Sequence, residues 1–242
     1  MKIGVLSCGP VAGDLVGKYG EYDRVFARWL GAYDDSLSFT GYDAHKGEIP
    51  CDVREVDAWL LSGSKYGVYE EHDWIEPLKV FIRDCAAAKA PMIGVCFGHQ
   101  IMAEALGGKA EKWSGGWNLG PKTYDASRLP DWAPEHDSAL TIHAVHQDQV
   151  TTPPPSATVV MSHPDCACAA MAFGDVAKPH AISIQPHPEF GDEFAGELIE
   201  LRRGNAFPEA DASAALSDIG AKLDRDWAAA WFLSFLRLQN AQ

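Results

Sequence analysis

The chain has 242 residues, of which 47% are hydrophobic and 22% are charged, so disorder, collagen-like repeats and membrane spans are all disfavoured. Its formal net charge of −14 disfavours non-specific nucleic-acid binding, because neutralising phosphates takes clustered cations and only 20 Lys and Arg are present. The six cysteines are too sparse and irregular for the disulfide framework of a secreted protein. We therefore expect a cytoplasmic protein with no nucleic-acid or membrane partner.

Short apolar runs alternate with amphipathic, helix-like stretches through the first hundred residues. This alternation is typical of a parallel sheet that is covered by helices on both faces. Strands are predicted at residues 2–7, 36–41, 58–61 and 92–95, and helices at residues 21–30, at 74–89 and from Cys96 to a stop at Gly107–Gly108. The apolar start of the chain favours a buried first strand over a signal peptide, since it has no evident cleavage site.

Turns and aromatic residues become more frequent after Gly108. The β-like runs at 140–145, 158–161 and 181–185 predict further strands that extend the sheet, some of them antiparallel. The three prolines at 153–155 form a run short enough to be a turn, with a rigid linker as the alternative.

No linker divides the sequence, which favours one domain over residues 1–242. Residues 226–238 carry aromatic side chains at helical spacing, so we expect a terminal helix within a helical segment of about residues 193–242 that packs on the domain. The predicted fold is a three-layer α/β/α arrangement with a mainly parallel central sheet.

Gly94-Val95-Cys96-Phe97-Gly98 places a cysteine between two glycines, where a strand is expected to lead into a helix. Small flanking residues permit the sharp, strained turn of a nucleophile elbow, and the positive potential of a helix N-terminus favours thiolate over thiol. A buried cysteine that only fills the core is the alternative for this run taken alone. Cys96 is therefore a candidate nucleophile that needs support from elsewhere in the chain.

Gln185-Pro186-His187-Pro188-Glu189 supplies that support. A residue before proline favours extended backbone, and residues two apart in extended chain face the same side, so His187 and Glu189 are expected to point together. A carboxylate beside an imidazole fixes its tautomer and stabilises its charged form, as the third member of a triad does. A surface turn with a capping Glu189 is the alternative, but the joint occurrence with Cys96 predicts a triad.

These two motifs resemble the two signatures of the class I, or triad-type, glutamine amidotransferases, and the similarity covers most of the chain. Residues 62–70, Ser-Gly-Ser-Lys-Tyr-Gly-Val-Tyr-Glu, are similar to a turn in stand-alone relatives of the GMP synthase glutaminase domain. The resemblance implies a flavodoxin-like fold and a triad of Cys96, His187 and Glu189. It also implies an oxyanion hole made by the backbone N–H groups of Phe97 and Ser64, with Ser64 in place of the commoner glycine.

The resemblance also implies a set of substrate-binding residues. Gln100, on the first turn after Cys96, matches a residue that helps bind glutamine, and a core amide that only satisfies its neighbours is the alternative. Residues 145–150 are similar to a His-Gly-Asp stretch whose backbone holds the α-amino and carboxylate groups, with a structural pair of His146 and Asp148 as the alternative. The implied binding residues are Gly63, Gln100, His146, Gln147 and Asp148.

Other patterns do not indicate a cofactor. His163, Cys166 and Cys168 lack the paired spacing of a structural zinc site, and the sequence has no phosphate-binding loop of the Gly-x-x-x-x-Gly-Lys-Ser/Thr type. We therefore expect no metal and no cofactor.

The implied reaction is attack by Cys96 on the γ-amide of glutamine or a related γ-glutamyl substrate, through a γ-glutamyl thioester that water then hydrolyses. Three hypotheses remain open. The chain could supply ammonia to a separate acceptor or synthetase enzyme, or it could act independently on γ-glutamyl amides or peptides. The third hypothesis is a catalytically silent regulatory protein on the same scaffold, which the intact triad disfavours.

Overall fold

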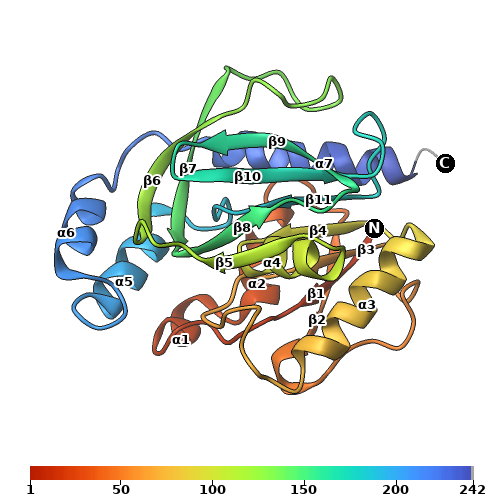
Figure 1. Ribbon diagram of the computed structural model, residues 1–242, viewed down its shortest axis with the longest axis horizontal. Helices are drawn as coiled ribbons and strands as arrows, with labels where there is room; N and C mark the ends of the chain where they lie inside the picture. The colour runs from red at the N-terminus through yellow and green to blue at the C-terminus, as the bar shows by residue number, and fades with distance from the viewer. Residues whose placement is uncertain (241–242) are drawn as a thin grey trace.

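The computed structural model describes residues 1–240 and has a nine-stranded sheet at its centre (Figure 1). The strand order is β2-β1-β3-β4-β11-β10-β9-β6-β7. The first five strands in this order are parallel to one another, and β10, β9, β6 and β7 each pair antiparallel with their neighbours. A separate antiparallel pair is formed by β5 and β8. The strands are β1 (Lys2–Leu6), β2 (Ser38–Tyr42), β3 (Ala58–Leu61), β4 (Met92–Val95), β5 (Lys109–Lys112), β6 (Asn118–Asp125), β7 (Ala139–His146), β8 (Asp148–Thr152), β9 (Ala157–His163), β10 (Cys166–Phe173) and β11 (Ala181–Ile184).

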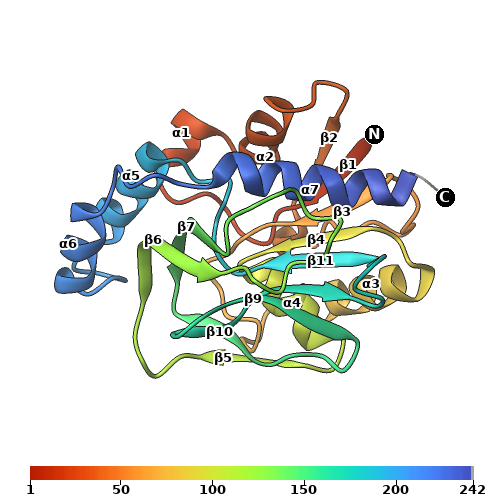
Figure 2. The same ribbon diagram turned by 90° about the horizontal axis from the view of Figure 1, so that it is seen from above.

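Helices cover both faces of the sheet and create three layers (Figure 2). Helices α2 and α7 lie on one face, and α3 and α4 lie on the other. The helices are α1 (Leu15–Tyr19), α2 (Tyr22–Gly31), α3 (Ile75–Ala88), α4 (Phe97–Ala105), α5 (Asp192–Arg202), α6 (Glu209–Ser217), α7 (Arg225–Asn240) and the 3-10 helix η1 (Ala44–Lys46). Within residues 1–240, every helix is too short or too polar to cross a bilayer.

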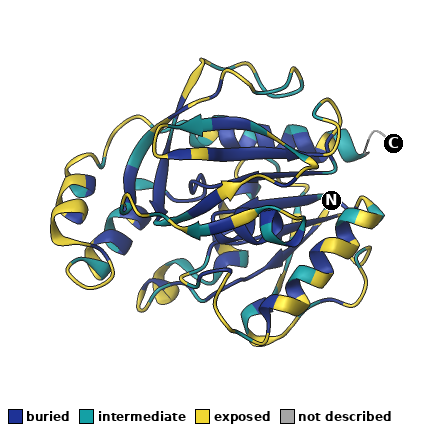
Figure 3. Ribbon diagram, in the orientation of Figure 1, coloured by how far each residue is buried: buried dark blue, intermediate teal, exposed yellow. Residues whose placement is uncertain are grey.

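Successive side chains of the central strands pack alternately into two separate hydrophobic cores, because neighbouring residues of a strand point to opposite faces of the sheet. In β3, Ala58 and Leu60 pack in the core under α2 and α7, whereas Trp59 and Leu61 pack under α3 and α4. Figure 3 shows the central strands buried and the outer side of α3 exposed. Burial on both faces explains why these strands appear in the sequence as uninterrupted apolar runs.

The terminal aromatic residues form the packed helix that their spacing predicts. Trp231, Phe232 and Phe235 of α7 are fully buried, and the Trp29 ring of α2 packs edge-on against Phe232 at 5.5 Å between centroids. The last two residues of the expected 193–242 segment, 241 and 242, lie outside the described residues.

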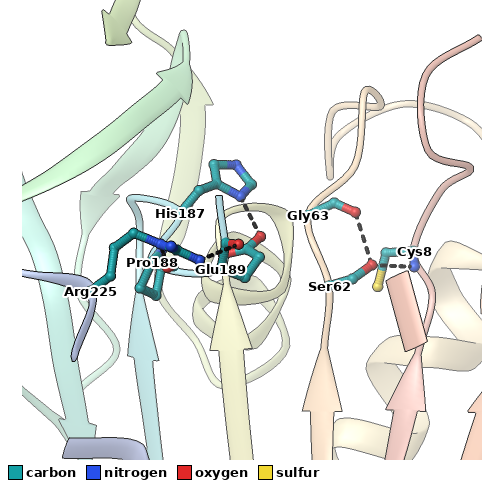
Figure 4. Close-up of polar contacts among 7 residues, drawn as sticks. All are labelled: Cys8, Ser62, Gly63, His187, Pro188, Glu189 and Arg225. Atoms are coloured by element: carbon teal, nitrogen blue, oxygen red, sulfur yellow. Dashed lines mark hydrogen bonds and ion pairs between the residues drawn. The ribbon is translucent and has the colours of Figure 1, made fainter. Parts of the chain in front are cut away.

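The parallel strands bring four loops to one edge of the sheet. Strands β1, β3, β4 and β11 run in the same direction, so the residues that follow their carboxyl ends meet there. Figure 4 shows the residues after β1, β3 and β11 side by side. Because ligands of open α/β sheets bind at this edge, the functional site is expected among these loops.

Candidate active site

Cys96 sits at a strained turn between β4 and α4. Its φ of 52° and ψ of −103° lie in a region that side-chain-bearing residues rarely adopt. The glycines around it permit the turn: a Cβ on Gly94 would lie 2.7 Å from the Gly98 carbonyl, and one on Gly98 would lie 2.3 Å from the Leu61 oxygen. The sequence motif therefore folds as an elbow that places Cys96 at the N-terminus of α4.

His187 and Glu189 are paired, as the sequence predicts, with 2.7 Å between Nδ1 and Oε1. Both are buried, at 3% and 4% exposed. The expectation that extended chain continues from His187 to Glu189 is wrong: β11 ends at Ile184, and the Phe190 N–H donates to the His187 carbonyl at 3.3 Å, which closes a turn at Pro188 and Glu189. The turn brings the two side chains together instead of a strand.

The His187 ring is held in one orientation. It stacks on Phe190 at 4.1 Å between centroids and 3° between planes, and its backbone N–H donates to the His143 carbonyl at 2.8 Å. Burial alone lowers the pKa of His187, but the negative charges of Glu189 and Cys96 outweigh it and hold this pKa well above its usual value. The site therefore favours a protonated His187 imidazole beside Glu189.

A long-range contact that the sequence does not reveal holds the His187–Glu189 turn in place (Figure 4). Arg225, the first residue of α7, donates from Nε to the Pro188 carbonyl at 2.9 Å and from a terminal nitrogen to the Glu189 carbonyl at 3.1 Å. Asp224 anchors the same helix start on β7, because its carboxylate accepts from the Thr141 N–H at 2.7 Å. An arginine at the start of an amphipathic helix resembles an ordinary surface charge, so no local pattern points to it.

The turn after β3 is fixed by a buried serine. The Ser62 hydroxyl accepts from the Cys8 N–H at 2.9 Å and donates to the Gly63 carbonyl at 2.9 Å (Figure 4). The Ser62 carbonyl accepts from the Gly98 N–H at 3.1 Å, which ties this turn to the start of α4. The bonds bring residues 63 and 64 close to Cys96 and Phe97.

Gly63 lies directly against the side chains of the candidate nucleophile and the candidate base. A Cβ built on Gly63 would stand 2.7 Å from the His187 Cε1 atom and 3.6 Å from the Cys96 Cβ atom. This spacing leaves room for glycine alone unless His187 moves. The structure therefore joins the predicted residues Gly63, Cys96 and His187 at one point.

Ser64, the predicted oxyanion donor, uses its side chain inside the turn. Its hydroxyl accepts from the Tyr66 N–H at 3.1 Å and faces Gly9, where a Cβ would come within 2.7 Å of Oγ. The added side chain is thus accommodated away from Cys96. Ser64 and Cys96 line the same cavity, and the Gly98–Ser62 bond places the Phe97 end of α4 beside it.

This cavity has a volume of about 170 Å³ and opens beside Cys96. Its lining includes the predicted residues Gln100, His146, Gln147 and Asp148. The lining also includes the basic residues Lys65, Lys112 and Arg202 and the acidic residues Glu70 and Asp148. Three aromatic residues complete it: Tyr66, Tyr69 and Trp117. Such a mixed lining suits a ligand that carries both an ammonium and a carboxylate group.

Hydrogen bonds link the predicted binding residues Gln100, His146 and Asp148. Gln100 donates both side-chain N–H bonds to protein oxygens, to the Asp148 carbonyl at 2.8 Å and to Gln185 Oε1 at 3.1 Å. His146 also approaches the Asp148 carbonyl, at 3.2 Å, and the Tyr69 hydroxyl donates to the Asp148 carboxylate at 2.9 Å. Gln100 and His146 therefore position the Asp148 backbone as well as lining the cavity.

Burial sets the charge state of this wall. It lowers the pKa of His146 to about 3, so this imidazole is neutral at pH 7. Burial also raises the pKa of Asp148, an effect that Tyr69 and Lys112 oppose. The side-chain amide of Gln147 is bound to the backbone, since it donates to the Trp113 carbonyl at 3.2 Å.

The family model for glutamine amidotransferase class-I matches residues 18–200 of the 242. The chain belongs to the class I glutamine amidotransferase family. Gamma-glutamyl peptidase 5 of Arabidopsis thaliana is 29% identical over 196 residues, which cover 75% of this chain and 73% of that protein. A GMP synthase (glutamine-hydrolyzing) of Ralstonia pickettii is 36% identical over 157 residues, covering 61% of this chain and 28% of the synthase. The family assignment confirms the resemblance that the motifs indicated.

Solved structures agree with the α/β fold. A glutamine amidotransferase from Thermotoga maritima superposes with a TM-score of 0.75 at 19% identity, covering 99% of this chain and 98% of the other. One from Methylobacillus flagellatus gives a TM-score of 0.76 at 19% identity, with 98% and 94% covered. The predicted flavodoxin-like architecture with a mainly parallel sheet is confirmed.

Proposed function

We propose that this chain hydrolyses the γ-amide of glutamine or a related γ-glutamyl compound, with Cys96 as nucleophile, His187 as acid and base, and Glu189 as the group that orients His187. The observation that carries the proposal is the joint geometry: a cysteine at a strained elbow beside a buried His187–Glu189 pair at 2.7 Å. Neither feature alone distinguishes a catalytic site from a packed core.

The chemistry follows from the positions of these atoms. His187 takes the Cys96 thiol proton as Sγ bonds to the γ-carbonyl carbon, and the carbonyl oxygen becomes an oxyanion that the N–H groups of Phe97 and Ser64 stabilise. The C–N bond then breaks, and His187 gives its proton to the departing amine. Water adds to the thioester, His187 takes its proton, the C–S bond breaks, and glutamate leaves.

For glutamine the leaving group is ammonia, which a separate acceptor enzyme could use. These 242 residues contain no phosphate loop of the Gly-x-x-x-x-Gly-Lys-Ser/Thr type, so the acceptor reaction would need a synthetase site outside them. We expect slow hydrolysis of free glutamine by the isolated chain and faster turnover when such a partner is present.

The lining of the cavity favours a second candidate, independent hydrolysis of γ-glutamyl peptides. Tyr66, Tyr69, Trp117 and Lys112 line the cavity beside Cys96 and provide aromatic surface and positive charge for an amino-acid leaving group. The match to γ-glutamyl peptidases over about three quarters of both chains supports the same reading.

A substrate screen tests both candidates. Release of ammonia from L-glutamine and of free amino acid from γ-glutamyl dipeptides is measured for the purified chain, with and without cell extract, and for Cys96→Ala. We expect Cys96→Ala to lose at least about 10⁴-fold in activity on every substrate, as removal of a covalent nucleophile does. A higher kcat/KM for dipeptides, independent of extract, would favour the peptidase. Equal turnover by wild type and Cys96→Ala would contradict the proposal.

A further inference from the structure

A second, much smaller cavity lies on the His187 side of the site. Its volume is about 20 Å³, and its polar lining comes from Tyr22, Ser64, Lys65, His187 and Arg202. It shares Ser64, Lys65, Val145 and Arg202 with the larger cavity beside Cys96. The two spaces therefore adjoin, with Cys96 lining the larger and His187 lining the smaller.

The small cavity matches one water molecule in size and chemistry. A cavity needs roughly 10–15 Å³ to hold a water, and the water needs two to four polar partners. Tyr22, His187 and Arg202 line the cavity and carry groups that can bond to a water, whereas Pro10, Ala12, Phe190, Phe194 and Leu198 contribute apolar wall. A carboxylate or an amino-acid side chain needs more space than the cavity has.

Tyr22 is an uncharged polar residue of this wall that the proposed mechanism does not use. It is the first residue of α2, is 8% exposed and lines the small cavity. Burial, with smaller contributions from the negative charges of Glu189 and Cys96, raises the pKa of Tyr22 far above its usual value. The hydroxyl is therefore neutral at all pH values of interest and can both donate and accept.

We propose that the small cavity holds the water that hydrolyses the γ-glutamyl thioester, and that Tyr22 positions this water for His187. The inference rests on the proposed function. His187 removes one proton from the water, the oxygen bonds to the thioester carbonyl carbon, and the C–S bond breaks with the electron pair going to Cys96 Sγ. Tyr22 exchanges no proton overall, because it only orients the oxygen lone pair toward the carbonyl carbon.

Tyr22→Phe tests the proposal, since it removes the hydroxyl and leaves the ring. With L-glutamine as substrate, we measure kcat, kcat/KM and, by intact-protein mass spectrometry after an acid quench, the fraction of enzyme that carries a γ-glutamyl group. The breakdown of this adduct is then followed after rapid removal of glutamine. The lost hydrogen bond is expected to prolong the adduct lifetime about tenfold, with kcat/KM changed by less than about twofold because acylation is untouched.

Two further variants make the result specific. Ala12→Val adds two methyl groups at the cavity wall without changing a polar group, and it should also prolong the adduct lifetime by displacing the water. Tyr42→Phe is the matched control: its hydroxyl donates to Glu55 at 2.7 Å on a partly exposed strand, and its loss should leave the adduct lifetime unchanged.

The outcomes separate this inference from the proposed function. If wild type and Tyr22→Phe form adducts that break down equally fast, the inference fails while the role of Cys96 stands. A raised KM with unchanged adduct lifetime would assign Tyr22 to substrate binding and would also overturn the inference. If no γ-glutamyl adduct forms in any protein and glutamine is still hydrolysed, the proposed function itself fails.

Discussion

His187→Ala is expected to abolish turnover, with a loss of at least about 10⁴-fold in kcat/KM, whereas Glu189→Gln should retain a small, measurable rate. His187 is the residue that can both take the thiol proton and give it to the leaving amine, because its Nδ1 faces Glu189 and its Nε2 lies toward Gly63 and Cys96. Glu189 acts through His187, so the isosteric amide removes the charge but keeps the ring in place. Steady-state kinetics on both substrate types measures the difference.

A surface histidine provides the control for this prediction. His136 lies near α7, with its ring 5.6 Å from that of Trp227, and His136→Ala should retain wild-type kinetics. Equal and mild losses from His187→Ala and Glu189→Gln would mean that the turn after β11 is structural and that the base lies elsewhere.

Gly63→Ala is expected to cost about a hundredfold in kcat/KM while the protein stays folded. The new methyl group would stand 2.7 Å from His187 Cε1, so the His187 ring must leave its observed position. Moving a base relative to its nucleophile lowers the reaction rate, because the reacting atoms must be aligned. The same change leaves the buried Ser62 hydrogen bonds in place, and thermal unfolding should therefore differ little from wild type.

Gly31→Ala is the matched control for Gly63→Ala. A Cβ on Gly31, at the end of α2, has no neighbour within 4 Å, so the same chemical change should leave activity unaffected. Wild-type kinetics for Gly63→Ala would show that His187 does not need its observed position, and the proposed arrangement of the site would then be wrong.

The central parallel strands and their helices could be predicted because apolar runs buried on both faces leave a plain signal in the sequence. Strand β10 could not be predicted, since Cys166–Phe173 contains four alanines and lacks the β-branched residues and alternation that favour strands. It becomes a strand because it pairs with both β9 and β11 in the middle of the sheet. Tertiary context decides the structure of such a segment.

The candidate triad could be predicted because Cys96, His187 and Glu189 lie in two short motifs with local chemical meaning. The supporting contacts could not, because Arg225 and Tyr22 reach the site from helices that are distant in sequence from the motifs. The backbone of the His187–Glu189 pair also differs from the expectation, since Pro188 and Glu189 form a turn instead of extended chain. Local rules predicted which side chains meet but not the backbone that brings them together.

The six cysteines provide the most direct test of the central claim, that Cys96 is the nucleophile. Burial raises the pKa of Cys8 and Cys85 to about 12 and also raises that of Cys166 and Cys168, which makes these four thiols poor nucleophiles. Cys51 is exposed and reports any non-specific reaction. The reactivity of Cys96 can therefore be compared with that of the five other cysteines in the same molecule.

The measurement is peptide mass mapping after treatment with a glutamine analogue that carries an electrophile at the γ-position. The account predicts about one label per chain, on Cys96, with Cys51 unmodified and with labelling suppressed by excess glutamine. Labelling of Cys51 before Cys96, or labels spread evenly over the six cysteines, would contradict it.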